Sequence, residues 1–141
     1  MKKIRAYLID PKEKEVNKLM IDYDPNDGYF WKKLKGHIEL FDDDLLQIIS
    51  ANHEDIGKYQ RDSILLDEEG LLKEDKKELF LWFMFESNYY HILCGKALVI
   101  GTQENGIWCS PDYTEQDIRD RILWDCNNLH KHPRIKNYYE G

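Results

Sequence analysis

The sequence lacks a hydrophobic run of the roughly 20 residues that a membrane-spanning helix needs. Its start, MKKIRAYLIDPKEKE, regains charge at Asp10, and no cleavage site of small residues follows. This start therefore differs from a secretory signal peptide. Both observations favour a cytoplasmic protein.

Cysteine is scarce: Cys94, Cys109 and Cys126 are the three in the chain, and no two of them form a CxxC pair. An odd number without such spacing argues against a disulfide framework and against a zinc site. We expect reduced thiols.

A basic excess is missing as well. The 141 residues carry a net charge of -7, and residues 39–78 alone hold 13 acidic residues against 5 basic ones. General nucleic-acid binding needs a basic face that neutralises phosphates, so no direct nucleic-acid binding is expected. A partner with a basic surface would be attracted.

The stretch ILCGKALVIGT (residues 92–102) has the lysine and glycines of a phosphate-binding loop without its pattern. The motif GxxxxGK[ST] requires a hydroxyl residue after the lysine and a glycine five residues before Gly95. Here Ala97 follows Lys96, and Tyr90 stands at the earlier position. The apolar residues after Lys96 predict a strand instead.

Other catalytic and metal-binding patterns are incomplete in the same way. The histidines do not have zinc-site spacing, and the run Asp42–Asp44 lacks the interleaved spacing of a calcium loop. His91 and Cys94 project differently on a strand, and no orienting acid is indicated. We expect no cofactor, no metal site and no enzymatic activity.

What the sequence does contain is a regular alternation of apolar segments and turns. It predicts a hairpin over residues 3–22, a nearly continuous apolar central strand over Glu78–Glu86, and a hairpin over residues 97–110. A short helix is expected near residues 29–35, and a longer one near 114–126 with Thr114 as N-cap and Asp117 three residues on. The secondary structure of residues 37–62 is not decided by the sequence: Asp42–Ile49 fits a strand or a helix, and the polar stretch 51–62 is expected to be a surface loop.

Together these elements predict one α+β domain, a mostly antiparallel sheet with two helices, over residues 1–129. Residues 130–141 are predicted to form a basic, loosely held tail. A homo-oligomer is compatible with this pattern, because an aromatic-rich sheet edge can pair with its twin.

The acidic block has two interpretations. Its charge either keeps an aromatic-rich protein soluble or forms a face that docks on a basic partner protein. For the second interpretation, the candidate protein-binding residues are Asp42, Asp43, Asp44, Glu54, Asp55, Glu68 and Glu69.

A different hypothesis places a nucleotide-like molecule among the aromatic residues. Aromatic stacking combined with a guanidinium is one way to hold such a ligand, although core packing explains the same aromatics. The candidate ligand-binding residues are Tyr89, Tyr90, Lys96, Trp108, Arg119 and Arg121.

The segments MKKIRAYLIDPKEKEV, LLDEEGLLK and GKALVIGT together resemble a group of small proteins carried by phages, plasmids and other mobile elements. That group has no assigned activity, so no residue role is carried over. The resemblance implies a bacterial or phage setting, in which small acidic proteins often inhibit host defence systems. We therefore expect a non-catalytic inhibitor that binds a host or defence protein, or alternatively a sponge that sequesters a nucleotide-derived signal.

Overall fold

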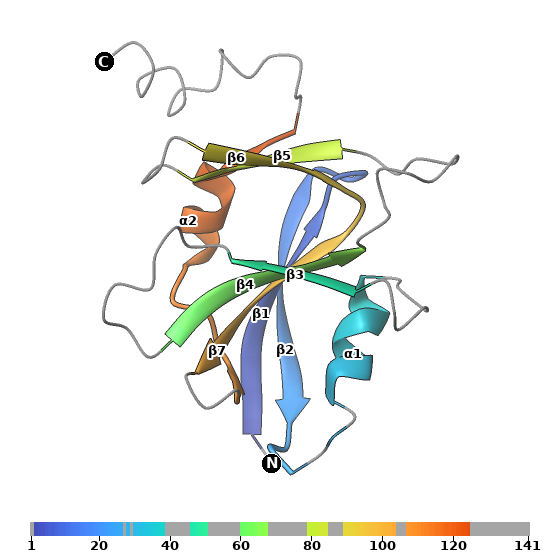
Figure 1. The fold of residues 1–141 in the computed structure, drawn as a ribbon, viewed down its shortest axis with the longest axis vertical. Coiled ribbons are helices and arrows are strands. Elements are labelled where there is room, and N and C mark those ends of the chain that lie inside the picture. The colour runs from blue at the N-terminus through green and yellow to red at the C-terminus, as the bar shows by residue number, and fades with distance from the viewer. Residues whose placement is uncertain are drawn as a thin grey trace.

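The computed structural model describes residues 2–26, 28, 30–38, 46–50, 60–67, 79–84, 89–103 and 107–124. Within these residues the chain forms a mostly antiparallel β-structure with two short helices, so the predicted α+β class is confirmed (Figure 1). The elements are β1 (Lys2–Asp10), β2 (Glu15–Tyr23), α1 (Phe30–His37), β3 (Leu46–Ser50), β4 (Gln60–Asp67), β5 (Leu79–Met84), β6 (Tyr89–Cys94), β7 (Ala97–Gln103), β8 (Trp108–Cys109), α2 (Glu115–Asp120) and β9 (Ile122–Leu123).

The main sheet has the strand order β2-β1-β7-β4-β3, and every pair in it is antiparallel. The predicted hairpin over residues 3–22 is confirmed as β1 and β2, which pair from Lys2–Tyr23 to Asp10–Glu15. Strand β7 pairs with β1 through Ala97–Val99 and with β8 through Gly101 and Thr102. The predicted hairpin over residues 97–110 is therefore confirmed, and β7 is the central strand.

A second, smaller sheet has the order β6-β5-β9 and crosses one end of the main sheet (Figure 1). The chain passes from β6 to β7, and so from one sheet to the other, through Gly95 and Lys96 alone. Gly95 has φ 82°, a left-handed conformation that glycine adopts without steric cost. The stretch ILCGKALVIGT is thus a strand, a corner and a strand.

Side chains from the two faces of the main sheet pack into two hydrophobic clusters. The first core cluster combines Val99 of β7 with Phe80 and Trp82 of β5 and with Ile118 of α2. The second core cluster combines Leu98 of β7 with Phe30 and Leu34 of α1. Because side chains alternate along a strand, β7 is buried on both sides.

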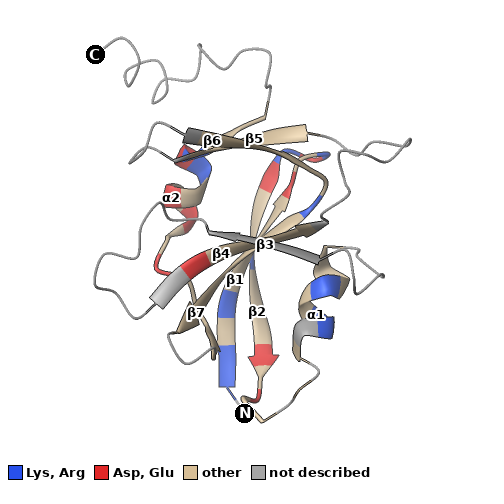
Figure 2. Ribbon diagram, in the orientation of Figure 1, with Lys and Arg blue, Asp and Glu red and all other residues tan. Residues whose placement is uncertain are grey.

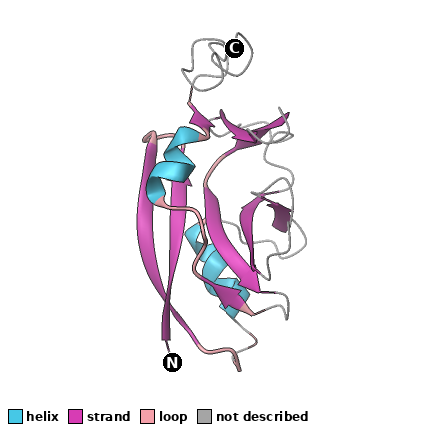
Figure 3. Ribbon diagram, turned by 90° about the vertical axis from the view of Figure 1, so that its left-hand side faces the viewer, coloured by secondary structure: helices cyan, strands magenta, loops and turns pink. Residues whose placement is uncertain are grey.

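The helices lie toward opposite ends of the molecule, with α2 at the end occupied by β5 and β6 (Figures 1 and 3). Helix α1 confirms the short helix expected near residues 29–35. Neither described helix is long and apolar enough to cross a membrane.

The prediction of a long helix over residues 114–126 is wrong in its extent. Thr114 is the expected N-cap: its Oγ1 accepts from the Asp117 N–H at 3.1 Å, and the Asp117 carboxylate accepts from the Thr114 N–H at 2.9 Å. The helix ends at Asp120 because Ile122 and the residue after it pair with β5 instead. Ile122 is 4% exposed in the first core cluster, so tertiary packing outweighs the helical spacing of the apolar residues.

For the ambiguous segment 37–62, the described residues favour strands. The residues 46–49, for which a helix was an alternative, lie in β3, and β3 pairs with β4 from Leu46–Asp67 to Ser50–Ser63. Residues 60–62 were expected in a surface loop and instead begin β4, paired with the far end of β7. Within the predicted strand 78–86, the described residues Leu79–Met84 form β5, the central strand of the small sheet.

Candidate functional site

The acidic residues predicted to bind a partner all lie outside the described residues, but the strand ends that adjoin two of their runs in the sequence are described. Leu46 and Asp67 are paired at one end of the β3–β4 pair. The sequence runs back from Leu46 to Asp44 and on from Asp67 to Glu68. The acidic runs 42–44 and 68–69, far apart in sequence, therefore adjoin the same end of this strand pair.

The described residues do not share the acidity of the chain. They contain 13 Lys and Arg against 11 Asp and Glu, a balance of +2, whereas the whole chain has a net charge of -7. Figure 2 shows basic residues on α1 and along β1 and mixed charges on α2. The acidic excess lies in the remaining residues.

One acid of the 39–78 block has a structural role that the sequence did not reveal. Asp62 is fully buried in β4, and its two carboxylate oxygens accept from the backbone N–H groups of Asp112 and Tyr113 at 2.9 and 2.8 Å. Charge-assisted bonds of this kind are stronger than neutral ones. Asp62 therefore fixes the segment that leads into α2 and is unavailable to a partner.

Two further contacts hold the same segment against the main sheet. The Arg5 N–H donates to Ser110 Oγ at 2.8 Å, and the Arg5 guanidinium donates to the Pro111 carbonyl at 3.0 Å. Gly101 permits this close approach, because a Cβ atom there would lie 2.8 Å from the Ser110 carbonyl oxygen. The segment 108–113 is thus anchored through β1, β4 and β7.

Cys109 lies within this anchored segment and is buried. Burial raises the pKa of its thiol, the charges of Asp62 and Asp112 raise the pKa further, and Lys2 opposes them. These influences favour the protonated thiol, which is the weaker nucleophile.

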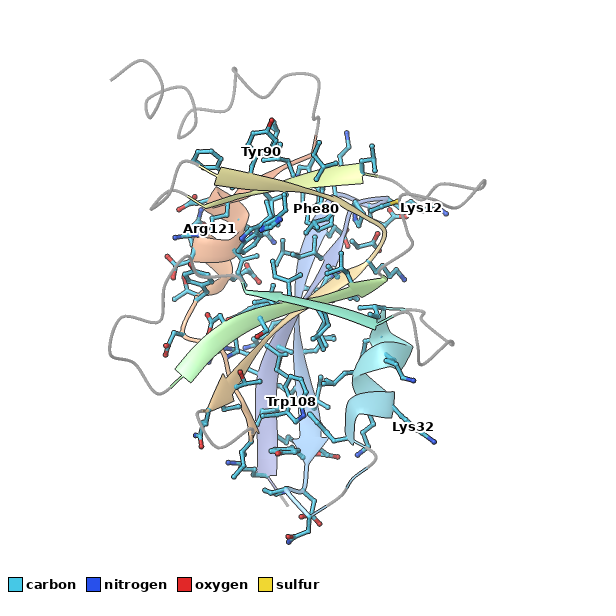
Figure 4. The ribbon with its side chains drawn as sticks, viewed as in Figure 1. Lys12, Lys32, Phe80, Tyr90, Trp108 and Arg121 are labelled. Atoms are coloured by element: carbon cyan, nitrogen blue, oxygen red, sulfur yellow. The ribbon has the colours of Figure 1, made fainter. Side chains whose placement is uncertain are left out.

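Trp108, a predicted ligand contact, packs against the second core cluster. Its ring lies 6.3 Å from that of Phe30, and its backbone N–H donates to the Tyr23 hydroxyl at 3.2 Å. Figure 4 places Trp108 far from Tyr90 and Arg121. Trp108 is therefore part of the protein's own packing at the α1 side.

The two predicted arginines make contacts within the protein. Arg119 donates to the Val16 carbonyl at 3.1 Å and to Glu115 at 3.3 Å. The Arg121 guanidinium lies 4.4 Å from the centre of the Tyr113 ring and donates to the Asp117 carbonyl at 3.0 Å. Both arginines secure α2 to its surroundings.

The remaining predicted ligand residues lie on or just after β6. Tyr90 is 40% exposed, Lys96 is half-buried at the corner between the sheets, and the side chain of Tyr89 lies outside the described residues. The described members of the predicted set are thus distributed over β6, the inter-sheet corner, the α1 side and α2. They do not converge on one site.

Three partly exposed apolar residues on the small sheet were not anticipated from the sequence. Tyr90, Ile92 and Leu79 are 40%, 45% and 39% exposed, and all three lie on one face, as their pairing shows. We call these three residues the β6 patch. Alternation along YYHILC was the available signal, but the run resembled a buried strand.

His91 and Cys94 lie on opposite faces of β6, as expected: His91 pairs with Trp82, and Cys94 pairs with Leu79. Burial lowers the pKa of His91, which favours the uncharged imidazole at neutral pH. Among the described residues, no group of three or more His, Cys, Asp or Glu side chains is placed to hold a metal ion.

No protein-family model, no curated protein and no solved structure matches the chain.

Proposed function

We propose that the chain is a non-catalytic binding protein of a phage or other mobile element. It acts in the cytoplasm of a bacterial host, where it inhibits a host or defence protein by docking an acidic surface on it. The observation that carries this proposal is the Leu46–Asp67 pair, which joins the acidic runs 42–44 and 68–69 to the same end of the β3–β4 pair.

The charge distribution supports the same proposal. The described residues are close to electrically balanced, so the acidic excess lies in the other residues of the chain, mainly those between 39 and 78 in the sequence. A concentrated charge steers a basic partner toward one place and accelerates the encounter. Acids kept only for solubility do not need to be grouped in this way.

The test compares two double charge reversals in binding to host proteins. The full chain is immobilised, incubated with bacterial lysate, and washed at rising salt before the retained proteins are identified. We expect a basic protein whose retention falls steeply with salt and is lost in Asp43→Lys/Asp44→Lys. The control Glu13→Lys/Glu15→Lys changes the charge equally at two exposed residues, in the β1–β2 turn and at the start of β2, and should leave retention unchanged. Equal retention by both variants would contradict the proposal.

A nucleotide sponge is the second candidate, and the pair formed by Arg121 and Tyr113 favours it, because stacked guanidinium and aromatic groups also bind nucleotides. A ligand that binds the folded state raises the melting temperature. A panel of linear and cyclic nucleotides should then produce a rise in Tm that Arg121→Gln removes. No rise with any of them would reject this candidate.

A further inference from the structure

The outer edge of β6 combines an unpaired backbone with an uncharged surface. Within the part of the chain that the structure describes, β6 pairs only with β5, so its other edge has no strand beside it. Proteins commonly protect such edges with lysine, proline, bulges or very short strands. The sequence of β6, YYHILC, contains neither lysine nor proline.

The register shows which backbone groups face this edge. In an antiparallel pair, a residue directs its N–H and C=O groups to the same side. The Phe83 N–H donates to the Arg121 carbonyl at 2.8 Å, on the β9 side of β5. The backbone N–H and C=O groups of Phe83 therefore point away from β6. Tyr90, the residue opposite Phe83 on β6, forms a non-hydrogen-bonded pair with it.

It follows that Tyr90 directs its own N–H and C=O groups toward the open edge. Ile92, two residues further along, is opposite Leu81 and does the same. Both residues also have exposed apolar side chains, at 40% and 45%. Backbone and side chains are thus available at the same positions.

The other long sheet edge with described side chains is built differently. Strand β2 ends the main sheet and exposes Glu15, Lys18 and Asp22 along its length, with Met20 as its one strongly exposed apolar residue. Charged side chains of this kind oppose edge-to-edge pairing. Of these two edges, β6 is the one suited to a second strand.

We propose that β6 pairs with β6 of a second copy of this chain, antiparallel and centred on His91, so that the two small sheets form one continuous sheet. Tyr90 of each copy then lies opposite Ile92 of the other, and each such pair exchanges both of its N–H···O bonds. This proposal is independent of the function proposed above.

A second copy fits this edge better than a charged partner does. The chain has a net charge of -7, so two copies repel each other unless they meet where charge is absent. Strand β6 has no acidic or basic residue apart from His91, whose uncharged form is favoured. The β6 patch continues across the two-fold axis on one face, which buries Tyr90 and Ile92 of both copies.

The register is tested with a cross-link at the two-fold axis. Residues in a non-hydrogen-bonded pair have Cα atoms about 4.5 Å apart, within the range that a disulfide spans. Under mild oxidation, His91→Cys should give a covalent dimer joined at position 91. Tyr90→Cys places its two thiols two residues out of register, more than about 7 Å apart, and should not cross-link. The parent chain, with its native cysteines, is oxidised in parallel.

The assembly itself is measured by sedimentation of the full chain. We expect a mass of twice the 17.0 kDa of one chain at about 100 µM, a concentration at which even a weak dimer is populated. Ile92→Lys should weaken association at least tenfold. Met20→Lys, at a comparably exposed apolar position on β2, should leave it unchanged.

Three results would overturn the proposal: a monomer at that concentration, a dimer that Ile92→Lys does not weaken, or a dimer that cross-links at position 90 but not at 91. Circular dichroism of each variant shows whether its fold is intact. If His91→Cys does not fold, the pair Ile92→Lys and Met20→Lys still decides the outcome.

Discussion

The two faces of the main sheet are covered in different ways. The face of the second core cluster is covered by α1, which follows β2 closely in sequence. Phe30 and Leu34 of α1 pack into the cluster, and Lys33 donates to the Asp22 carbonyl of β2 at 3.4 Å on the exposed side. The face of the first core cluster is covered by β5, β6 and α2, which are remote from β1 and β2 in sequence. There, buried polar bonds from Asp62 and Arg5 hold the segment that leads into α2.

This difference shows what holds a segment on the sheet when it is remote in sequence from the strands that it contacts. A helix that follows its own strand is brought back to the sheet by a short connection, so it loses less entropy on docking. The segment at Asp112, 50 residues along the chain from the Asp62 that holds it, loses more entropy on docking. Directed bonds from a buried carboxylate restrict it to one position, since each unmade bond leaves a polar group unsatisfied.

The largest loss of stability should come from a substitution in β5, which with β6 and α2 covers the face of the first core cluster. Trp82→Ala deletes a side chain that is fully buried and whose ring lies tilted 6.2 Å from that of Tyr113, and it should lower the free energy of unfolding by about 3–5 kcal/mol. Leu34→Ala, equally buried on the α1 side, removes a smaller side chain and should cost less, within the range of about 2–5 kcal/mol. Urea denaturation of both variants measures the difference. A larger loss for Leu34→Ala would mean that α1 stabilises the sheet more than β5 does.

The next largest loss of stability should come from the Asp62 carboxylate, which we call the polar anchor. Asp62→Ala leaves the N–H groups of Asp112 and Tyr113 without their acceptor and should cost about 2 kcal/mol. Asp62→Asn keeps one acceptor oxygen and should cost about half as much. Amide exchange at residues 112 and 113 should accelerate in both variants, while exchange at α1 should stay as it was. Equal acceleration on both faces would show that the anchor is not local.

The same pair of variants has a second readout at Cys109. Asp62 is one of the charges that raise the pKa of that thiol, after burial itself. Asp62→Asn removes the charge, so the pKa of Cys109 should fall toward its ordinary value. NMR titration of the Cys109 Cβ resonance measures this shift independently of stability.

A smaller loss is expected at the start of α2. Thr114→Ala removes the hydroxyl that accepts from the Asp117 N–H and should cost about 1 kcal/mol. Thr114→Ser retains the hydroxyl and is the matched control. Since α1 has no part in this cap, the helical signal of α1 should be unchanged in both variants.

The smallest effect is the dependence of stability on pH through Asp117. The backbone N–H of Thr114 holds the pKa of this carboxyl below its usual range, helped by the Thr114 hydroxyl and Arg121 and opposed by partial burial. A carboxyl with a lowered pKa in the folded state stabilises the protein above the pKa of the unfolded chain. That contribution is lost as the pH falls below about 4 and through the folded-state pKa. Asp117→Asn should therefore flatten this acid limb in thermal denaturation, and an unchanged limb would contradict the assignment.

The sequence predicted α1 and the β1–β2 hairpin better than the β5, β6 and α2 layer on the other face of the main sheet. The β1–β2 hairpin, α1 and the Thr114 N-cap follow from neighbouring residues, and all were predicted. Strand β9 was not, because Ile118 and Ile122 have helical spacing and only pairing with β5 shows that the helix has ended. Asp62 stood among other acids in a polar stretch, and nothing local indicated that it would be buried.

For the candidate surfaces too, the sequence showed what depends on neighbouring residues and not what depends on strand pairing. The acidic block was visible as composition, and the sequence could not show that its two runs adjoin one strand pair, because that depends on the β3–β4 register. The β6 patch requires both the alternation of YYHILC and the knowledge that β5 covers only one edge. Predicted ligand residues such as Trp108 were chosen by residue type, and their separation became apparent only in three dimensions.

The position of β7 determines how the molecule comes apart. Its consecutive residues Leu98 and Val99 belong to different core clusters, and both are fully buried. Neither cluster can open widely without exposing a strand that the other one needs. Helix α1 on one face and the β5, β6 and α2 layer on the other should therefore unfold in a single calorimetric transition. The β7 amides should stay protected from hydrogen exchange until the whole molecule unfolds.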